Sequence, residues 1–384
     1  MKMNYNNPIS GKLIFDALKD KNVIVMAANI RIQHCFRSII DAAKETDSAV
    51  LFEIAKSEIG YTDQQPEEFA RVCKEAIKAA KCNVPYCIHG DHITISENTP
   101  AAIATAEDLI KKEIDAGFTS FAIDASHNFD VAAAKTINQL AANIKITTHL
   151  AKLIEKLMKE KGKTRADYSL EVEVGEIGKI DPKTGKQELT TVDEAVTFIK
   201  ALHENGIYPD LIATNNGTIH GNVYDAEGNV IPLLGIDDKR TREVANAIAS
   251  LRVKIAQHGI TGTPLELMHK LIDARIAKGN VATHWQDLAI ANMPPDLVKK
   301  MEQWTLDKYR ANAKAKKPDM SDKEIIGKNI KNAIKPFKKE IADIDDNYKE
   351  KIYKACKASA IEYFEAFNGK GSGKVVRDAI ESKK

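Results

Sequence analysis

The chain has 384 residues, of which 43% are hydrophobic and 29% are charged, so it is long enough to bury a sizeable core. Its formal net charge of +2 is too small to favour nucleic acid as a partner. The sequence contains no secretory signal, no apolar run long enough to span a bilayer, and no CxxC pair among its five cysteines. We therefore expect a cytoplasmic protein without a membrane partner, whose cysteines are free thiols.

Eight short apolar runs alternate with helical patterns along most of the chain. They are residues 22–29, 48–55, 84–91, 120–126, 169–175, 211–217, 253–259 and 278–284. Nearly continuous apolar runs are typical of parallel strands that are covered on both faces. Eight strand–helix repeats predict a (β/α)8 TIM barrel over residues 1–305. A doubly wound open sheet is the alternative, but it usually has fewer strands, and no GxGxxG follows the first strand here.

Helix signals fill the segments between these strands. The long connection after the fourth strand predicts an extended helix or a helix pair. Thr191 and Glu194 have the spacing of a capping box, and Thr263 followed by Pro264 predicts a helix with proline at its first position. After about Trp304 the sequence becomes lysine-rich and loses its strand pattern. We predict a helical extension over residues 306–384 that packs on the barrel or on a neighbouring subunit.

Polar side chains gather at the C-terminal ends of the predicted strands, where a barrel of this kind has its site. His92, His220 and His258 come from the third, sixth and seventh strands, and three neutral imidazoles with an open position suit a catalytic zinc ion. The carboxylates predicted to lie nearby, as acid, base or partners of the ligands, are Asp91, Asp124 and Glu173. Any one histidine at a strand end is more often a structural residue, but the coincidence of several favours a metal site.

The loop after the seventh strand, HGITGTPLE, contains glycine and runs into the predicted helix. Its amides would hold a phosphate at the helix N-terminus, and phosphate sites after strands seven and eight are common in such barrels. A plain strand-to-helix turn is the alternative for this loop considered alone.

Taken in chain order, these motifs resemble those of the class II, metal-dependent fructose-bisphosphate aldolases. The matching segments are HGDH, AIDASH, EVEVGEIG, GTIHG and HGITG. The resemblance implies reversible cleavage of fructose 1,6-bisphosphate to dihydroxyacetone phosphate and glyceraldehyde 3-phosphate. It also implies a Zn²⁺ cofactor, or Co²⁺, Fe²⁺ or Mn²⁺ in its place, with a monovalent cation as a further candidate, and a homodimer or homotetramer.

The resemblance assigns a role to each candidate residue. Asp91 would be the catalytic acid/base, and Asn280 would hydrogen-bond the developing charge. Asp181 or Glu188, in the loop after the fifth strand, would move the substrate proton. His92, His220 and His258 would bind the metal, while Asp124 and Glu173 would steer these ligands or hold the metal in a second position. The residues implied to contact the substrate or its phosphate are Asn29, Ser57, Gly221, Gly259, Thr261 and Thr283.

The sequence also departs from the family pattern. Ile260 and Thr261 replace a glycine and a serine of the family's HGGSG, and Ala282 replaces an aspartate in its NxDTD motif, which here ends at His284. No cationic residue for a second phosphate can be placed.

Four alternatives remain open. An aldolase for another ketose, such as tagatose 1,6-bisphosphate, would need nearly the same residues. A metal-dependent hydrolase usually has an HxH pair on its first strand, which is absent here. A Schiff-base aldolase needs a lysine on the sixth strand, which is also absent. A non-enzymatic binding protein would have no need of Asp91.

Overall fold

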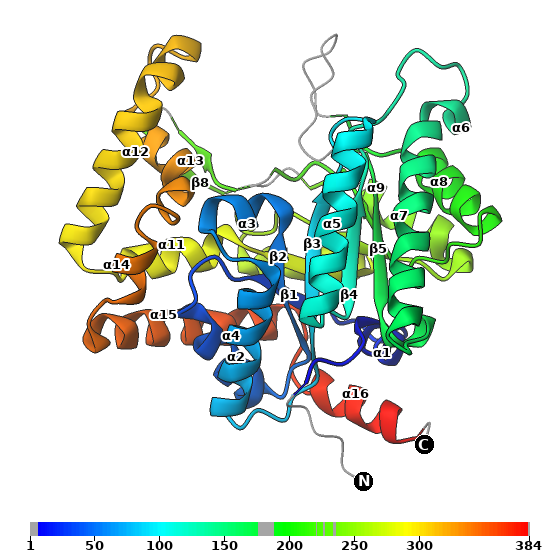
Figure 1. The fold of residues 1–384 in the computed structure, drawn as a ribbon, viewed down its shortest axis with the longest axis horizontal. Helices are drawn as coiled ribbons and strands as arrows, with labels where there is room; N and C mark the ends of the chain where they lie inside the picture. Colours follow the sequence, from blue (N-terminus) through cyan, green and yellow to red (C-terminus); the bar gives the residue numbers. More distant parts are fainter. Residues whose placement is uncertain (1–6, 176–187, 220, 226, 233–235, 383–384) are drawn as a thin grey trace.

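The computed structural model describes residues 7–175, 188–219, 221–225, 227–232 and 236–382. Its centre is a closed barrel of eight parallel strands surrounded by helices (Figure 1), which confirms the predicted TIM barrel. The barrel strands are β1 (Val25–Asn29), β2 (Val50–Ala55), β3 (Tyr86–Thr94), β4 (Ser120–Asp124), β5 (Ser169–Val174), β6 (Leu211–Thr214), β9 (Lys254–Gln257) and β10 (Ile276–Val281). Because β1 pairs with both β2 and β10, the sheet closes, and the open-sheet alternative is wrong.

Helices cover the outside of the barrel, and two short strands form a separate hairpin. The helices up to the end of the barrel are α1 (Gly11–Ala17), α2 (Cys35–Thr46), α3 (Lys56–Thr62), α4 (Pro66–Ala79), α5 (Pro100–Ala116), α6 (Thr136–Gln139), α7 (Ala141–Glu160), α8 (Val192–Glu204), α9 (Asp238–Ile248), α10 (Met268–Asp273) and α11 (Thr283–Ala291). The hairpin is β7 (Val223–Tyr224) with β8 (Val230–Ile231). The long connection after β4 forms α6 and α7, the predicted helix pair.

The helix starts agree only partly with the capping signals. Thr191 caps α8 in a capping box with Glu194, as predicted. The start expected at Thr263 and Pro264 is wrong. Pro264 keeps an extended backbone with ψ 139°, so a 3-10 turn (Leu265–Leu267) begins one residue later. The six-residue α10 follows this turn, so the loop does not run directly into the N-terminus of an α-helix.

The barrel interior changes from apolar to polar along the strand direction. At the N-terminal end it is filled by small and medium apolar side chains, on which α1 and the last helix pack: Val25, Ala27, Leu51, Cys87, Leu211, Ala213, Ala256 and Ala277. Two residues further along β2 and β3, Leu51 and Cys87 give way to Glu53 and His89, which are fully buried. Side chains two apart in a strand share a face, so the interior becomes polar toward the C-terminal ends.

The extension packs on the barrel of its own chain. Its helices are α12 (Pro295–Lys316), α13 (Asp322–Asn329), α14 (Lys338–Ala342), α15 (Asp346–Ala366) and α16 (Ser372–Glu381), with a 3-10 turn, η4 (Ile330–Ala333), after α13. α15 lies along α2 and α11, η4 contacts α3, and α16 contacts α1 (Figure 1). The boundary predicted after residue 305 lies inside α12. Within the described ranges, no helix combines the length and the apolar character needed to cross a bilayer.

Candidate active site and metal centre

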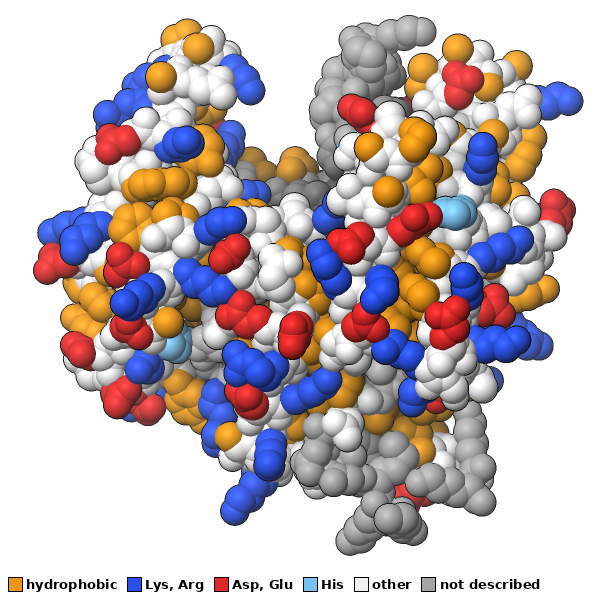
Figure 2. Space-filling view, viewed as in Figure 1, with side chains coloured by type: hydrophobic (Ala, Val, Ile, Leu, Met, Phe, Trp, Pro, Cys, Tyr) orange, Lys and Arg blue, Asp and Glu red, His pale blue; other side chains and the backbone are white. Residues whose placement is uncertain are grey.

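A cavity of about 440 Å³ opens at the C-terminal ends of the strands. In the space-filling view the molecule is hollowed at this end, beside the arm formed by α12 and α13 (Figure 2). The predicted residues that line the cavity are Asn29, Ser57, Asp91, His92, Asp124, Glu173, Gly221, His258, Gly259, Thr261, Asn280 and Thr283. His220 and Asp181 lie outside the described residues. The structure thus brings together side chains from β1, β3, β4, β5 and β10.

An irregularity in β3 places two consecutive side chains in this cavity. In a regular strand, neighbours such as Asp91 and His92 point to opposite faces. Here the pairing of β3 with β4 shifts between Gly90 and Ile93, and His92 has a φ of 42°. The shift turns both the carboxylate and the imidazole toward the cavity, at a cost in backbone strain that such sites often carry.

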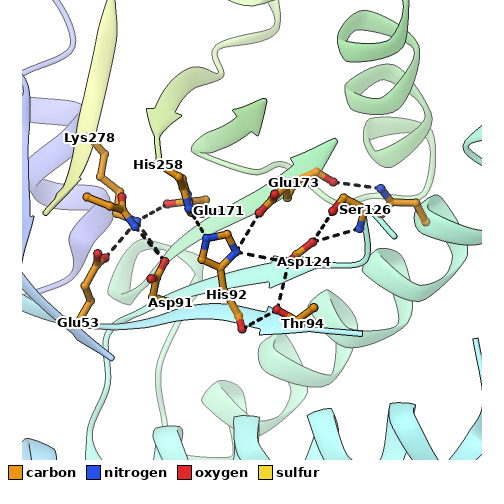
Figure 3. Close-up of polar contacts among 12 residues, drawn as sticks. Glu53, Asp91, His92, Thr94, Asp124, Ser126, Glu171, Glu173, His258 and Lys278 are labelled. Carbon is orange, nitrogen blue, oxygen red and sulfur yellow. Dashed lines mark hydrogen bonds and ion pairs between the residues drawn. The ribbon is translucent and has the colours of Figure 1, made fainter. Parts of the chain in front are cut away.

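Two histidines face one another at the centre of the cavity. His92 Nε2 and His258 Nδ1 point toward each other, and with an oxygen of Asp91 they form a group of potential ligand atoms within 4.8 Å. The other ring nitrogens contact carboxylates: His258 Nε2 lies 2.8 Å from Glu171 Oε1, and His92 Nδ1 lies 3.1 Å from Glu173 Oε2 (Figure 3). Metal-binding histidines are typically oriented in this way by carboxylates.

The charge around His92 also suits a cation. Burial alone would lower the pKa of His92, but Glu173 and Asp91 raise it well above its usual value. His92 also forms a second potential ligand group with Asp124 and Glu173. The donor set therefore fits a divalent metal held by His92 and His258, with Asp91 beside it and these two carboxylates at a neighbouring position.

Asp91 is held by two amides. Asn280 Nδ2 donates to Asp91 Oδ1 at 3.0 Å, and Asn29 Nδ2 donates to Oδ2 at 2.9 Å. Burial would raise the pKa of Asp91, but the positive charges of His92 and Lys278 hold it well below its usual value. These surroundings therefore favour the carboxylate form of Asp91. The amide donor of Asn280 points at Asp91, so in this arrangement it orients the carboxylate.

Two cationic residues of the cavity were missed from the sequence. Arg31 follows β1, and its Nε pairs with Glu58 Oε1 at 2.7 Å, while Nη1 donates to Thr283 Oγ1 at 3.2 Å. Lys331 comes from η4 of the extension. Arg31 lies two residues beyond Asn29, so its position after a strand could have indicated it. Nothing in the lysine-rich extension distinguishes Lys331 from its neighbours.

The glycines and threonines predicted for a phosphate all line the cavity, and Thr283 accepts a hydrogen bond from Arg31. Gly221 and Gly259 have φ values of 82° and 68°, which favour glycine. A Cβ on Gly259 would lie 2.7 Å from the Ile219 carbonyl oxygen, so the close approach also requires glycine. The backbone of these glycines, the hydroxyls of Thr261 and Thr283 and the guanidinium of Arg31 could all bind an anion.

Two further sequence positions do not line the main cavity. Glu188 is exposed and lines a separate small pocket with Ser126 and Gly175. His284, which ends the strand-eight motif, hydrogen-bonds through Nε2 to Ser359 Oγ of α15 at 2.7 Å. It therefore links α11 to the extension.

Comparison with known proteins identifies a family. A family model described as fructose-bisphosphate aldolase class-II matches residues 9–372. A fructose-bisphosphate aldolase of Sinorhizobium medicae is 27% identical over 227 residues, covering 56% of this chain and 55% of that protein. One from Staphylococcus aureus is 25% identical over 333 residues, covering 85% and 95%. The match to the first of these relatives thus spans only about half of its length.

Solved structures share the fold. A putative fructose-1,6-bisphosphate aldolase of Coccidioides immitis superposes with a TM-score of 0.60 at 17% identity, covering 94% of this chain and 96% of that one. The YdjI aldolase of Escherichia coli gives a TM-score of 0.57 at 19% identity, with the same coverage.

Proposed function

Because the chain belongs to the class II fructose-bisphosphate aldolase family, we propose that it catalyses the reversible aldol cleavage of a phosphorylated ketose, with fructose 1,6-bisphosphate as substrate. The observation that carries the proposal is the position of Asp91. Its carboxylate lies beside two facing imidazoles, in a cavity that also contains Arg31 and Lys331.

Cleavage breaks the bond between C3 and C4 of the ketose. Asp91 would accept the proton of the C4 hydroxyl, and the electron pair of the broken bond would pass to C3 and the neighbouring carbonyl. A divalent metal, Zn²⁺ or a similar ion, would polarise this carbonyl and stabilise the negative charge when bound by His92 and His258, with His220 as the third expected ligand. Asn29 and Asn280 would keep Asp91 oriented throughout.

The remaining protein groups would bind the substrate and complete the proton transfer. Gly221, Gly259, Thr261 and Thr283 would hold one phosphate, and Arg31 would add positive charge there. Lys331, which lies over the same Tyr61 ring as Arg31, would add a second positive charge at this end. The proton that C3 receives would come from the loop between β5 and α8, where Asp181 and Glu188 are the two candidates. The homodimer or homotetramer, and the cytoplasmic location, stay predictions.

The Schiff-base alternative would require an amine that can lose its proton. Lys278 lies inside the barrel, but on β10 and fully buried. Burial would lower its pKa, but Glu171 and Glu53 outweigh burial and raise it. These carboxylates favour the protonated amine, which is not a nucleophile. Borohydride treatment with substrate should therefore leave the chain unlabelled.

The deciding experiment is cleavage of fructose 1,6-bisphosphate, coupled to detection of triose phosphate. It should be run with metal-depleted protein and after addition of Zn²⁺, Co²⁺, Fe²⁺ or Mn²⁺. We expect activity only with metal. Full activity after complete metal removal, or no cleavage under any metal, would contradict the proposal. Tagatose 1,6-bisphosphate, which differs at C4, should be compared in the same assay, because the orientation of the C4 hydroxyl toward Asp91 decides between the two ketoses.

A further inference from the structure

Lys278 is a fully buried charge that the proposed reaction does not use. It reaches the barrel interior because the pairing of β10 with β9 shifts between Ile276 and Lys278. Beyond the shift, Lys278 pairs in register with Val25 of β1 and Ala256 of β9, both of which face the interior. An unpaired ammonium at this depth would be very costly, so its partners explain why the fold tolerates it.

The ammonium of Lys278 is surrounded by groups from three other strands (Figure 3). Lys278 Nζ lies 2.9 Å from Glu171 Oε2 and 3.1 Å from Glu53 Oε2. His89 Nε2 lies at 3.1 Å and Asp91 Oδ1 at 3.8 Å. Lys278 therefore links β10 to β2, β3 and β5 below the floor of the cavity.

Of the two glutamates that contact Lys278, only Glu171 is bonded in the described structure to a histidine of the metal site. Glu171 contacts Lys278 through Oε2 and His258 through Oε1, which lies 2.8 Å from His258 Nε2. A carboxylate fixed in this position accepts a hydrogen bond from the Nε2–H of His258. The lone pair of Nδ1 then points toward His92, where a metal would bind. Glu53 contacts Lys278 equally well, but the described structure gives it no bond to a ring nitrogen facing the metal site.

We propose that Lys278 is a positioning residue for the metal centre: its ammonium anchors Glu171, which fixes the tautomer and direction of His258. The inference rests on the proposed function, because it assumes that His92 and His258 bind a divalent metal. The same ammonium also lies 3.8 Å from Asp91 Oδ1, beside the proposed catalytic carboxylate.

The test measures metal affinity directly, with Zn²⁺ competed against a chromogenic chelator. Lys278→Met and Glu171→Gln should each weaken Zn²⁺ binding by roughly 10- to 100-fold, as loss of a ligand's orienting partner typically does. Combined, the two changes should weaken it little more than either alone, because both break the same link. The visible spectrum of bound Co²⁺ should also change in both variants, which a general loss of stability would not produce.

Glu53→Gln is the matched control. Glutamine keeps the size and shape of Glu53, a group whose pKa burial raises well above its usual value. This variant removes a partner of Lys278 but leaves Glu171 and His258 in place, and should bind Zn²⁺ as the unchanged protein does. If Lys278→Met does not fold, the Zn²⁺ affinity of Glu171→Gln alone decides whether the inference holds.

The outcomes separate this inference from the proposed function. If the unchanged protein binds no divalent metal, the proposed function fails. If it binds Zn²⁺, and Glu171→Gln binds it equally tightly, Lys278 has no positioning role and the aldolase proposal stands. Equal losses in Glu53→Gln and Glu171→Gln would also overturn the inference, because they would indicate a general disturbance of the interior.

Discussion

Lys331 Nζ lies 5.4 Å from the centre of the Tyr61 ring, so the C-terminal extension forms part of the cavity wall. The guanidinium of Arg31 lies 5.6 Å from the centre of the same ring. Burial and the charge of Arg31 lower the pKa of Lys331. An anion bound between these two cations would reduce their repulsion. This wall therefore suits one negatively charged end of a substrate.

Lys331→Met should raise KM for a ketose bisphosphate by roughly 10- to 100-fold, the effect expected for one lost charge-assisted hydrogen bond. The increase should be smaller for a ketose monophosphate that lacks the phosphate bound between Lys331 and Arg31. Lys335→Met is the control, because Lys335 lies in the same extension but pairs with Asp63, 3.3 Å away. An equal KM for Lys331→Met and Lys335→Met would show that Lys331 does not bind substrate.

Asp91→Asn should lower kcat by about 10²- to 10⁴-fold, since asparagine keeps the shape but cannot accept the C4 proton. Substrate binding and bound metal should change little. Steady-state kinetics and metal content of the purified variant measure the two effects. Asp115→Asn, on the exposed face of α5, should keep normal kinetics. Asp91→Asn with unchanged kcat would favour the non-enzymatic alternative or a different base.

Gly90→Ala should destabilise the protein by about 1–3 kcal/mol, because a Cβ at this position would collide with the buried carboxyl group of Glu113. The same collision would move β3 and hence Asp91, so activity should fall as well. Urea unfolding measures the stability change. Combining it with Glu113→Ala should recover part of the loss, since the colliding atoms are then absent. Gly60→Ala is a suitable control, because a Cβ there has no neighbouring atom within 4 Å.

Stability should fall as the pH falls from about 6.5 toward 4, in part through His284. Burial lowers the pKa of His284 from 6.5 to about 4, so the folded state favours the neutral ring. Between these values the unfolded chain binds more protons, and stability rises with pH. The loss is of order 2–3 kcal/mol when the pH has fallen to 4. Chemical unfolding at a series of pH values measures it.

His284→Gln should flatten this pH dependence, because glutamine does not titrate and can still hydrogen-bond to Ser359. His269→Gln, at an exposed position on α10, should leave the dependence unchanged. An unaltered slope in His284→Gln would mean that other groups cause the acid sensitivity.

The barrel could be predicted because its strands are nearly continuous apolar runs, which few other arrangements accommodate. The cavity-lining residues could be predicted because strand ends converge in such a barrel. Three features could not be predicted from the sequence. Asp91 and His92 were both predicted at the site, but not the irregularity of β3 that turns both toward the cavity. The irregularity of β10 that turns Lys278 inward could not be predicted either. Lys331 reaches the cavity through the tertiary packing of the extension, which no spacing in the sequence reveals.

Closure of the barrel joins the first and the last of its strands along the chain, since Val25 of β1 pairs with Lys278 of β10. During synthesis, Glu53 and Glu171 emerge from the ribosome well before the ammonium that later lies between them. Until β10 docks, the incomplete barrel would leave these acids exposed to water. Docking of β10 would then complete the hydrogen-bonded ring of strands and place a positive charge between Glu53 and Glu171. Closure of the barrel is therefore expected to be a late step in folding.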